Sequence, residues 1–271
     1  MMKACVSQAC TMASSFQEDV EGFARAGCQA MEAWLTKLEK HVEKNSLEST
    51  RKLLADHSIT LTAGSYQGGL LQSAGEQRQT HIDHFRQRLD LCQGLGIPLV
   101  LLCADLSGRM NQEIIQSAVA GLTQAAQWAE AYSTAIALEF RSTSAFCNNL
   151  QSALAMVNAC GMENLGVNLD LFHFFTGPSK TEDLVNIPTS KIFFVQASDL
   201  AGVPRELATD ADRIFPGEGE FPLTAVFETL KKKEYHGWVS FESFNPVLSQ
   251  ASPEQIAELG LKSIQRMFPP G

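Results

Sequence analysis

The sequence lacks the features of a membrane-embedded or secreted protein. None of its apolar runs approaches the roughly 20 residues that a membrane helix needs. The first residues, MMKACVSQACTM, contain neither the long apolar core nor the small-residue cleavage site of a secretory signal. We therefore expect a cytoplasmic protein that has no membrane partner.

Disulfide and zinc-ribbon patterns are also missing. The seven cysteines include no CxxC pair and lie scattered through apolar segments, which predicts reduced and mostly buried thiols; they are Cys5, Cys10, Cys28, Cys92, Cys103, Cys147 and Cys160. Cys103, at the end of PLVLLCAD, could act as a nucleophile. A free cysteine more commonly packs as a small apolar side chain, and this interpretation is favoured here.

Positive charge is scarce. The 271 residues carry 21 Lys and Arg against 30 Asp and Glu, and the formal net charge is -9. Such a chain does not attract a phosphate backbone non-specifically, so we expect no nucleic-acid partner. The basic run Lys231 to Lys233 is typical of the last turn of a helix, where Lys complements the helix dipole.

Short apolar runs recur at intervals along the whole chain and predict eight strands. They cover residues 3–8, 30–35, 60–65, 99–103, 135–140, 166–171, 192–197 and 238–241. Amphipathic segments lie between most of them, and they predict helices within 15–27, 81–96, 111–133, 144–161, 222–237 and 252–268. Because these connections are too long for hairpins, neighbouring strands should be parallel.

Eight such β-α units in 271 residues predict a single (β/α)8 TIM barrel, an α/β fold, that occupies residues 1–271 as one domain. An open doubly wound sheet is the alternative architecture. The glycine-rich phosphate turn expected after its first strand is absent. The barrel is therefore the favoured fold.

Polar residues end several of the apolar strands. Glu139 ends AIALEF, Asp170 ends the strand in VNLDLFHFF with His173 three residues later, Gln196 lies in VQASD, and Glu242 lies in WVSFESF. The carboxyl ends of all barrel strands face the active site, so these side chains should gather there. Glu32, at the end of an earlier strand, could reach the same pocket.

Several carboxylates in one pocket repel one another. Two like charges about 4 Å apart cost roughly 4 kcal/mol at an effective dielectric constant of 20. A bound cation or the protonation of one acid must relieve this cost. Carboxylate and amide oxygens form the hard shell that Mg2+ or Mn2+ prefers, so we predict a divalent metal ion among these side chains.

Each of these residues also has a purely structural interpretation. Glu139 could pair with Arg141, Glu242 could bind a helix N-terminus, and His173 could be a loop histidine that donates to a backbone carbonyl. A shared site remains the favoured interpretation, because charged residues are almost never buried unpaired.

The motifs ALEF, VNLDLFHFF, VQASD, RIFPGEGEFPL and WVSFESFNP, in this order, resemble those of the xylose isomerase-like TIM barrels. Within them, the resemblance is to the sugar phosphate isomerase/epimerase group, which also contains inosose dehydratases, hydroxypyruvate isomerases and ketose 3-epimerases. The resemblance covers the chain well from about Ala135 onward. In the first half it extends only to the expected architecture. It is only weakly specific for substrate.

The resemblance implies a role for each matching residue. Glu139, Asp170 and Glu242 take the places of three family metal ligands, and His173 matches the histidine of the family's DxxH, which contacts substrate. Gln196 stands where the family has a metal-binding histidine. A neutral amide is a weaker donor than imidazole, so metal affinity should fall, with Mn2+ or Mg2+ favoured over Zn2+.

Two arginines follow the seventh predicted strand. Arg213, in DRIFPGEG, matches a basic residue of the family and could grip a substrate carboxylate or phosphate. It could instead pair with Asp210 or Asp212, and both interpretations stay open. Arg205 is a weaker candidate for the same role.

The activity implied by the resemblance is metal-dependent isomerisation or epimerisation of a sugar, a sugar phosphate or a hydroxy-keto acid. Glu139 and Glu242 would exchange a proton with the substrate through an enediolate. Dehydration of a cyclic polyol ketone is an alternative activity. A second alternative, which Gln196 motivates, is a metal-poor, non-catalytic sugar-binding barrel. Endonuclease IV shares the barrel but needs a His-rich site and a basic groove. A homo-oligomer is possible.

Overall fold

The computed structural model describes residues 1–269 of the chain. Its eight strands form a closed parallel barrel in their order along the sequence, which confirms the predicted (β/α)8 fold. The chain forms two compact units. We call residues 1–63, together with the chain from Val195 onward, the terminal unit, and residues 64–194 the central unit.

The terminal unit contains four parallel strands in the order β7, β8, β1 and β2. These are β7 (Ile192–Ala197, from Val195), β8 (Trp238–Phe241), β1 (Lys3–Ser7) and β2 (Ala30–Trp34). Its α-helices are α1 (Phe16–Arg25), α2 (Leu35–Asn45), α3 (Leu47–Asp56), α9 (Leu223–Lys232) and α10 (Pro253–Met267). Short 3-10 helices are η1 (Gln8–Thr11), η3 (Arg205–Leu207), η4 (Asp210–Asp212) and η5 (Leu248–Gln250).

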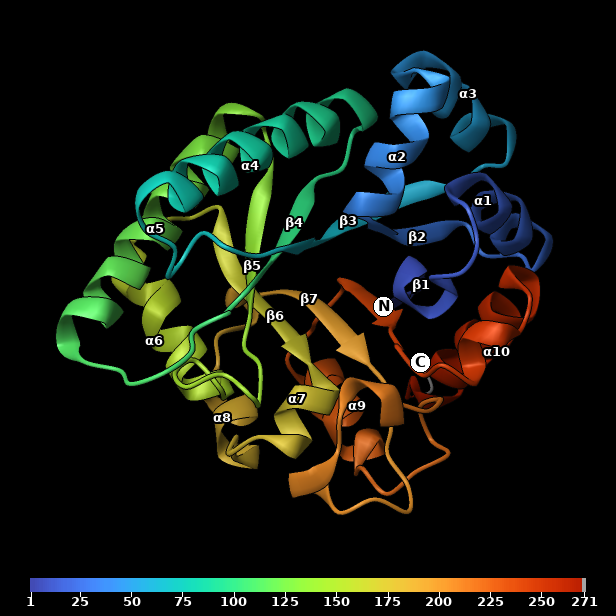
Figure 1. The fold of residues 1–271 in the computed structure, drawn as a ribbon. Coiled ribbons are helices and arrows are strands. Elements are labelled where there is room, and N and C mark those ends of the chain that lie inside the picture. The colour runs from blue at the N-terminus through green and yellow to red at the C-terminus, as the bar shows by residue number, and fades with distance from the viewer. Residues whose placement is uncertain (270–271) are drawn as a thin grey trace. The chain divides into compact units, whose positions relative to one another are not determined.

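The central unit contains the parallel strands β3 to β6 in sequence order. These are β3 (Thr60–Gln67, from Gly64), β4 (Leu99–Cys103), β5 (Ala135–Glu139) and β6 (Leu165–Asp170). The helices are α4 (Gly75–Leu95), α5 (Gln112–Ala131), α6 (Leu150–Cys160), α7 (Leu171–Thr176) and α8 (Thr181–Asn186), followed by the 3-10 helix η2 (Thr189–Lys191). Figure 1 shows α4, α5 and α6 along the strands of this unit.

Local chemistry sets where the helices begin and end. Ser15 and Glu18 form a capping box at the start of α1, and Gly96, in the left-handed conformation, ends α4. The predicted start at residue 144 for α6 is wrong, because the Asn149 side chain caps the helix by accepting from Ser152 N. The helices α2, α3, α7 and α8 were not predicted.

The barrel strands are buried on both faces, as a parallel sheet covered by helices requires. All five residues of β4 and all six of β6 are buried. Among residues 1–269, no helix combines the length and the apolar character that crossing a membrane would need.

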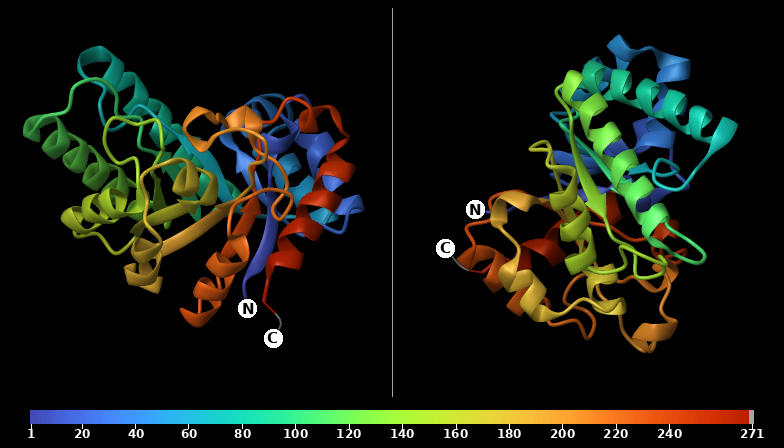
Figure 2. Two further views of the ribbon diagram at one scale, coloured as in Figure 1. Left: turned by 90° about the horizontal axis from the view of Figure 1, so that it is seen from below. Right: turned by 90° about the vertical axis from the view of Figure 1, so that its left-hand side faces the viewer.

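In the terminal unit, α1 packs closely against the start of α10. In Figures 1 and 2 these helices, blue and red, lie side by side. A Cβ atom built at Gly22 of α1 would lie 2.7 Å from Pro253 Cβ and 2.9 Å from Glu254 N. Position 22 therefore needs glycine because the two helix backbones approach each other there.

We expect Gly22→Ala to lower the free energy of unfolding by about 1–3 kcal/mol, because the added methyl group overpacks a contact with a rigid proline ring and a backbone atom. Urea unfolding measures this change. Gln17→Ala, on the exposed face of the same helix, is the control and should change stability by less than about 0.5 kcal/mol. Equal stabilities of Gly22→Ala and the wild type would contradict the packing argument.

Candidate functional site

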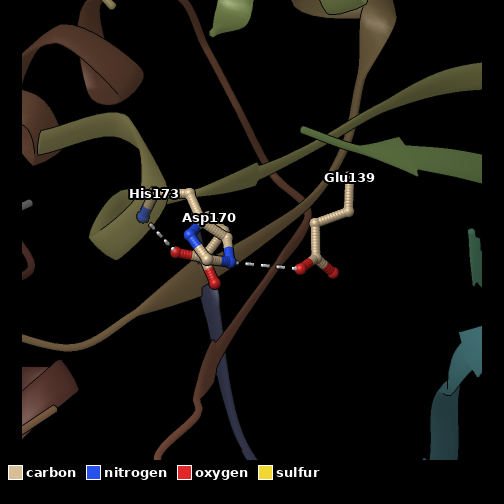
Figure 3. A group of neighbouring side chains, drawn as sticks. All are labelled: Glu139, Asp170 and His173. Carbon is tan, nitrogen blue, oxygen red and sulfur yellow. Dashed lines mark hydrogen bonds and ion pairs between the residues drawn. The ribbon is translucent and has the colours of Figure 1, made fainter. Parts of the chain in front are cut away.

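The central unit brings Glu139, Asp170 and His173 together. Glu139 ends β5, Asp170 ends β6 and His173 lies in the first turn of α7. Ligand-capable atoms of the three side chains all lie within 4.8 Å of one another, and His173 Nε2 is 3.8 Å from Glu139 Oε1 (Figure 3). At most 6% of the surface of any of them is exposed. The three side chains therefore form one buried polar group.

The close spacing of Asp170 and His173 has a local cause. Helix α7 begins directly after β6, and Asp170 is its N-cap. Asp170 Oδ1 accepts a hydrogen bond from His173 N at 2.9 Å, which satisfies one of the free amides at the helix start. The cap turns the chain so that the imidazole returns beside the carboxylate.

Glu139 is held by a residue that the sequence analysis missed. Asn168 Nδ2 donates to Glu139 Oε2 at 3.0 Å, and the two residues are neighbours in the β5–β6 ladder. Asn168 precedes Asp170 by two residues, so both side chains point to the same face of β6. This alternation is the signal that could have identified Asn168.

The central group suits a divalent metal ion. Two carboxylates and one imidazole offer oxygen and nitrogen donors, which divalent metals such as Mn2+ and Zn2+ accept. The two buried negative charges would also be neutralised by such an ion. The donor set and its spacing therefore fit a divalent cation.

The terminal unit gathers a second polar group around Gln196, which lies in β7. Gln196 Nε2 donates to Glu32 Oε1 at 3.0 Å and to Glu242 Oε1 at 2.7 Å. At most 4% of the surface of each of these three residues is exposed. The amide nitrogen of Gln196 thus bridges two buried carboxylates with its two N–H groups. Hydrogen bonds to charged acceptors are stronger than those to neutral ones.

Arg213 completes the terminal group. Its Nη1 lies 3.4 Å from Glu242 Oε2, while Nε and Nη2 donate to Asp210 Oδ1 at 3.0 and 2.7 Å. The guanidinium, with 1% of its side chain exposed, also lies over the Phe244 ring, 5.9 Å from its centroid. Of the predicted pairings of Arg213, the one with Asp210 is confirmed. Asp212 instead accepts hydrogen bonds from Thr209.

The sequence candidates Arg205 and Cys103, and also the loop residue Asp199, take structural positions. Arg205 is exposed and lies over the Phe221 ring, 5.4 Å from its centroid. Cys103 is buried within β4 and forms no disulfide bond. Asp199, beyond β7, accepts backbone hydrogen bonds from Leu200, Gly217 and Phe221, and so organises the loop after that strand.

Two thiols lie close to the acidic side chains of the terminal group. Burial and the nearby Glu242 carboxylate hold the pKa of Cys10 well above its ordinary value, and burial and Glu32 do the same for Cys5. Thiolates are the form in which cysteine binds metals or attacks electrophiles. Both residues are therefore neutral thiols at physiological pH.

The end of β2 is supported by a buried ion pair. Lys37 Nζ donates to Asp19 Oδ2 at 2.6 Å and to Thr11 O at 2.7 Å. Gln8 Nε2 donates to the same Asp19 oxygen at 2.7 Å, and Gln8 Oε1 accepts from Trp34 N at 3.0 Å. Burial outweighs the attraction of Lys37 and raises the pKa of Asp19 to about 6. This network connects α1 and α2 to the strand that carries Glu32.

The predicted site residues thus fall into two groups. Glu139, Asp170 and His173 lie together in the central unit, as expected, and Glu32, Gln196, Glu242 and Arg213 lie together in the terminal unit. That Glu139, Asp170, Gln196 and Glu242 share one metal ion stays a prediction.

The chain is similar to proteins of one known family. The family model for the xylose isomerase-like TIM barrel matches residues 20–267. An inosose isomerase of Halalkalibacterium halodurans is 29% identical over 259 residues, 94% of this chain and 92% of that protein. A 3-dehydroshikimate dehydratase of Pseudomonas putida is 26% identical over 257 residues, 94% of this chain and 40% of that protein. The crystal structure of the IOLI protein with a binding zinc atom has a TM-score of 0.91, 28% identity and 98% coverage of both chains.

The raised pKa of Asp19 predicts a pH dependence of stability. Its value is about 6 in the folded protein and near 3.8 in the unfolded chain, so the folded state binds the proton more tightly. The contribution of this proton binding to the free energy of unfolding is fully present below about pH 4 and is lost as the pH rises through about 6. The unfolding free energy of the wild type, minus that of Asp19→Asn, should therefore fall by up to about 3 kcal/mol between pH 4 and 7. Denaturant titrations at several pH values measure it. A difference that rises with pH would show that Lys37 dominates instead.

Gln196→Met tests the bridging amide. The substitution keeps the side-chain length but removes both N–H donors from Glu32 and Glu242, so we expect a loss of about 2–4 kcal/mol in unfolding free energy. Chemical denaturation of the metal-free protein measures the loss. Gln116→Met, on the exposed side of α5, is the matched control. Two variants of equal stability would contradict the bridge.

Proposed function

Because the chain belongs to the xylose isomerase-like TIM barrel family, we propose that it is a divalent-metal-dependent isomerase or epimerase of a small carbohydrate. The observation that carries this proposal is the buried group of Glu139, Asp170 and His173 at the ends of β5 and β6. Active sites of such barrels lie at the carboxyl ends of the strands.

We propose a hydroxy-ketone carbohydrate as the substrate, with a cyclic polyol ketone as the first candidate. The support comes from the inosose isomerase of Halalkalibacterium halodurans, whose match spans nearly all of both chains. A sugar, a sugar phosphate or a hydroxy-keto acid remains within the proposal. Arg213 and Glu32 are proposed as substrate contacts, since an arginine can bind a carboxylate or phosphate and a carboxylate can accept from hydroxyl groups.

Glu139, Asp170, Gln196 and Glu242 are the proposed metal ligands. A shell of three carboxylates and an amide favours Mn2+ or Mg2+ over Zn2+. When bound, the ion polarises the substrate carbonyl and thereby acidifies the neighbouring C–H bond.

The chain itself supplies the proton transfer. We propose that one of Glu139 and Glu242 removes the proton and that the other returns it, to the neighbouring carbon in isomerisation or to the opposite face in epimerisation. Asn168 holds one oxygen of Glu139, and Gln196 and Arg213 hold Glu242. These contacts hold both carboxylates in fixed orientations.

A dehydratase is the second candidate function. The match to the Pseudomonas putida 3-dehydroshikimate dehydratase favours it, because loss of a β-hydroxyl group follows the same proton abstraction. The third candidate is a metal-poor, non-catalytic sugar-binding barrel, which Gln196 motivates as a replacement of the family histidine.

Activity assays on metal-free and Mn2+-loaded protein, with a panel of inososes and ketoses in D2O, test the proposal. We expect turnover only with metal, with solvent deuterium entering the product, and a fall in kcat of about 10²–10⁴-fold in Glu139→Gln and in Glu242→Gln. Glu163→Gln, at an exposed position of the central unit, is the control and should retain full activity. Release of water from the substrate would identify a dehydratase, and binding without turnover would contradict an enzyme.

A further inference from the structure

The terminal unit has a groove of about 370 Å3 beside α1 and α2, two helices that pack against each other (Figure 1). It is lined by side chains within residues 12–17, from the loop before α1 and its first turn, and within residues 34–45, from the end of β2 and from α2. We call it the α1–α2 groove. Its volume falls within the range of small-molecule sites, about 300–1,000 Å3, and it includes no residue of either polar group described above.

The charged side chains that line the α1–α2 groove are all positive. They are Lys37, Lys40 and Lys44, in a chain whose net charge is -9. Their spacing of three and four residues places them on one face of α2. His41 lies on the same face, and burial lowers its pKa below the ordinary value, so the imidazole is neutral at physiological pH. The charge of the groove therefore comes from lysine alone.

Two of these lysines have no partner within residues 1–269. Lys37 is neutralised, because its Nζ donates to Asp19 Oδ2 at 2.6 Å and to Thr11 O at 2.7 Å. The exposed side chains of Lys40 and Lys44 form neither a hydrogen bond nor an ion pair with any residue of this range. Like charges four residues apart on a helix repel each other. An anion bound between the two ammonium groups would remove this repulsion.

The rest of the α1–α2 groove offers a hydroxyl group and aromatic surface. The Ser14 hydroxyl forms no hydrogen bond in the part of the chain that the structure describes, so its proton is available to a ligand. Phe16 is buried against His41, with the ring centroids 4.9 Å apart, and Trp34 is partly buried at the end of β2. The groove thus combines cations and a hydroxyl donor with rings on which a ligand can pack.

We propose that the α1–α2 groove binds a phosphate monoester of a small ring compound, that is, a sugar phosphate or a nucleoside monophosphate. Lys40 and Lys44 bind the phosphate group, which carries nearly two negative charges at pH 7, and Ser14 donates a hydrogen bond to it. The ring packs against Phe16 and Trp34. This inference does not depend on the proposed isomerase function, because no residue of the groove is a proposed metal ligand, proton carrier or substrate contact.

The dimensions of the helix agree with one phosphate held by two lysines. Residues four apart on a helix have Cβ atoms about 5–6 Å apart, so two flexible ammonium groups can reach the same anion. The positive charge is also local. Glu39 and Glu43 lie on α2 among the lysines, and Glu48 follows in the first turn of α3. A nucleic acid requires a continuous basic stripe, so a small ligand is the better fit.

Calorimetric titrations of the full chain with adenosine monophosphate, glucose 6-phosphate and inorganic phosphate test the proposal. We expect at least one monoester to bind about 10-fold more tightly than inorganic phosphate, because its ring adds aromatic contacts. The tighter of the two monoesters identifies the ring as a nucleoside or a sugar. The double variant Lys40→Gln/Lys44→Gln should raise the Kd at least about 30-fold, since it removes two charge-assisted hydrogen bonds.

A second pair of lysines controls for net charge. Lys232→Gln/Lys262→Gln removes the same charge from exposed positions of α9 and α10, outside the α1–α2 groove, and should leave the Kd unchanged. Circular dichroism shows whether the variants fold. If Lys40→Gln/Lys44→Gln does not fold, the two single variants decide, and each should raise the Kd about 5–10-fold.

Tryptophan fluorescence locates the ligand. The chain has three tryptophans, and Trp34 lines the α1–α2 groove whereas Trp128 and Trp238 do not. We expect the bound monoester to change the emission of the wild type, and this change to be lost in Trp34→Phe while calorimetry still detects binding.

Four results would overturn the proposal. They are the absence of binding of both monoesters, an unchanged Kd in Lys40→Gln/Lys44→Gln, an equal loss of affinity in the control pair, and an emission change that persists in Trp34→Phe. Binding of inorganic phosphate as tightly as both monoesters would overturn the assignment of a ring compound.

Discussion

Buried negative charge is the constraint on which both polar groups depend. A carboxylate removed from water loses its hydration and must recover it from donors or cations of the protein. In the central unit, Asn168 Nδ2 and the backbone of His173 donate to Glu139 and Asp170. In the terminal unit, Gln196 and Arg213 do the same for Glu32 and Glu242. Each group therefore combines acidic ligands with the donors that make their burial tolerable.

The departure from the family pattern at Gln196 acquires a physical meaning from these contacts. A histidine at this position would offer a lone pair to a metal, whereas the amide uses its nitrogen to bridge two carboxylates. Membership of the xylose isomerase-like family therefore accounts for the barrel. It does not by itself fix the donor set, which depends on how this chain uses Gln196 and His173.

Sequence patterns predicted the strands well because a buried parallel strand is a short apolar run with clear borders. The same borders identified Glu139, Asp170 and Gln196 as strand-end residues. Asn168 was missed because the prediction considered only the residues at the strand ends, although its two-residue spacing from Asp170 places it on the same face of the strand. The start of α6 and the short α7 were also missed, because they depend on single capping side chains, Asn149 and Asp170. The pairing of Arg213 with Asp210 depends on loop conformation, which no local pattern specifies.

The hydrogen-bond chain behind His173 has a consequence for proton traffic. A path that conducts protons needs every member to accept one proton and release another, but a backbone carbonyl at its end has none to release. Ser142 Oγ lies 3.2 Å from His173 Nδ1 and accepts from Thr176 Oγ1 at 3.1 Å, and Thr176 Oγ1 also lies 2.8 Å from Phe172 O, so the path ends at a carbonyl. Protons exchanged with a substrate would consequently pass through the carboxylates and not along this path.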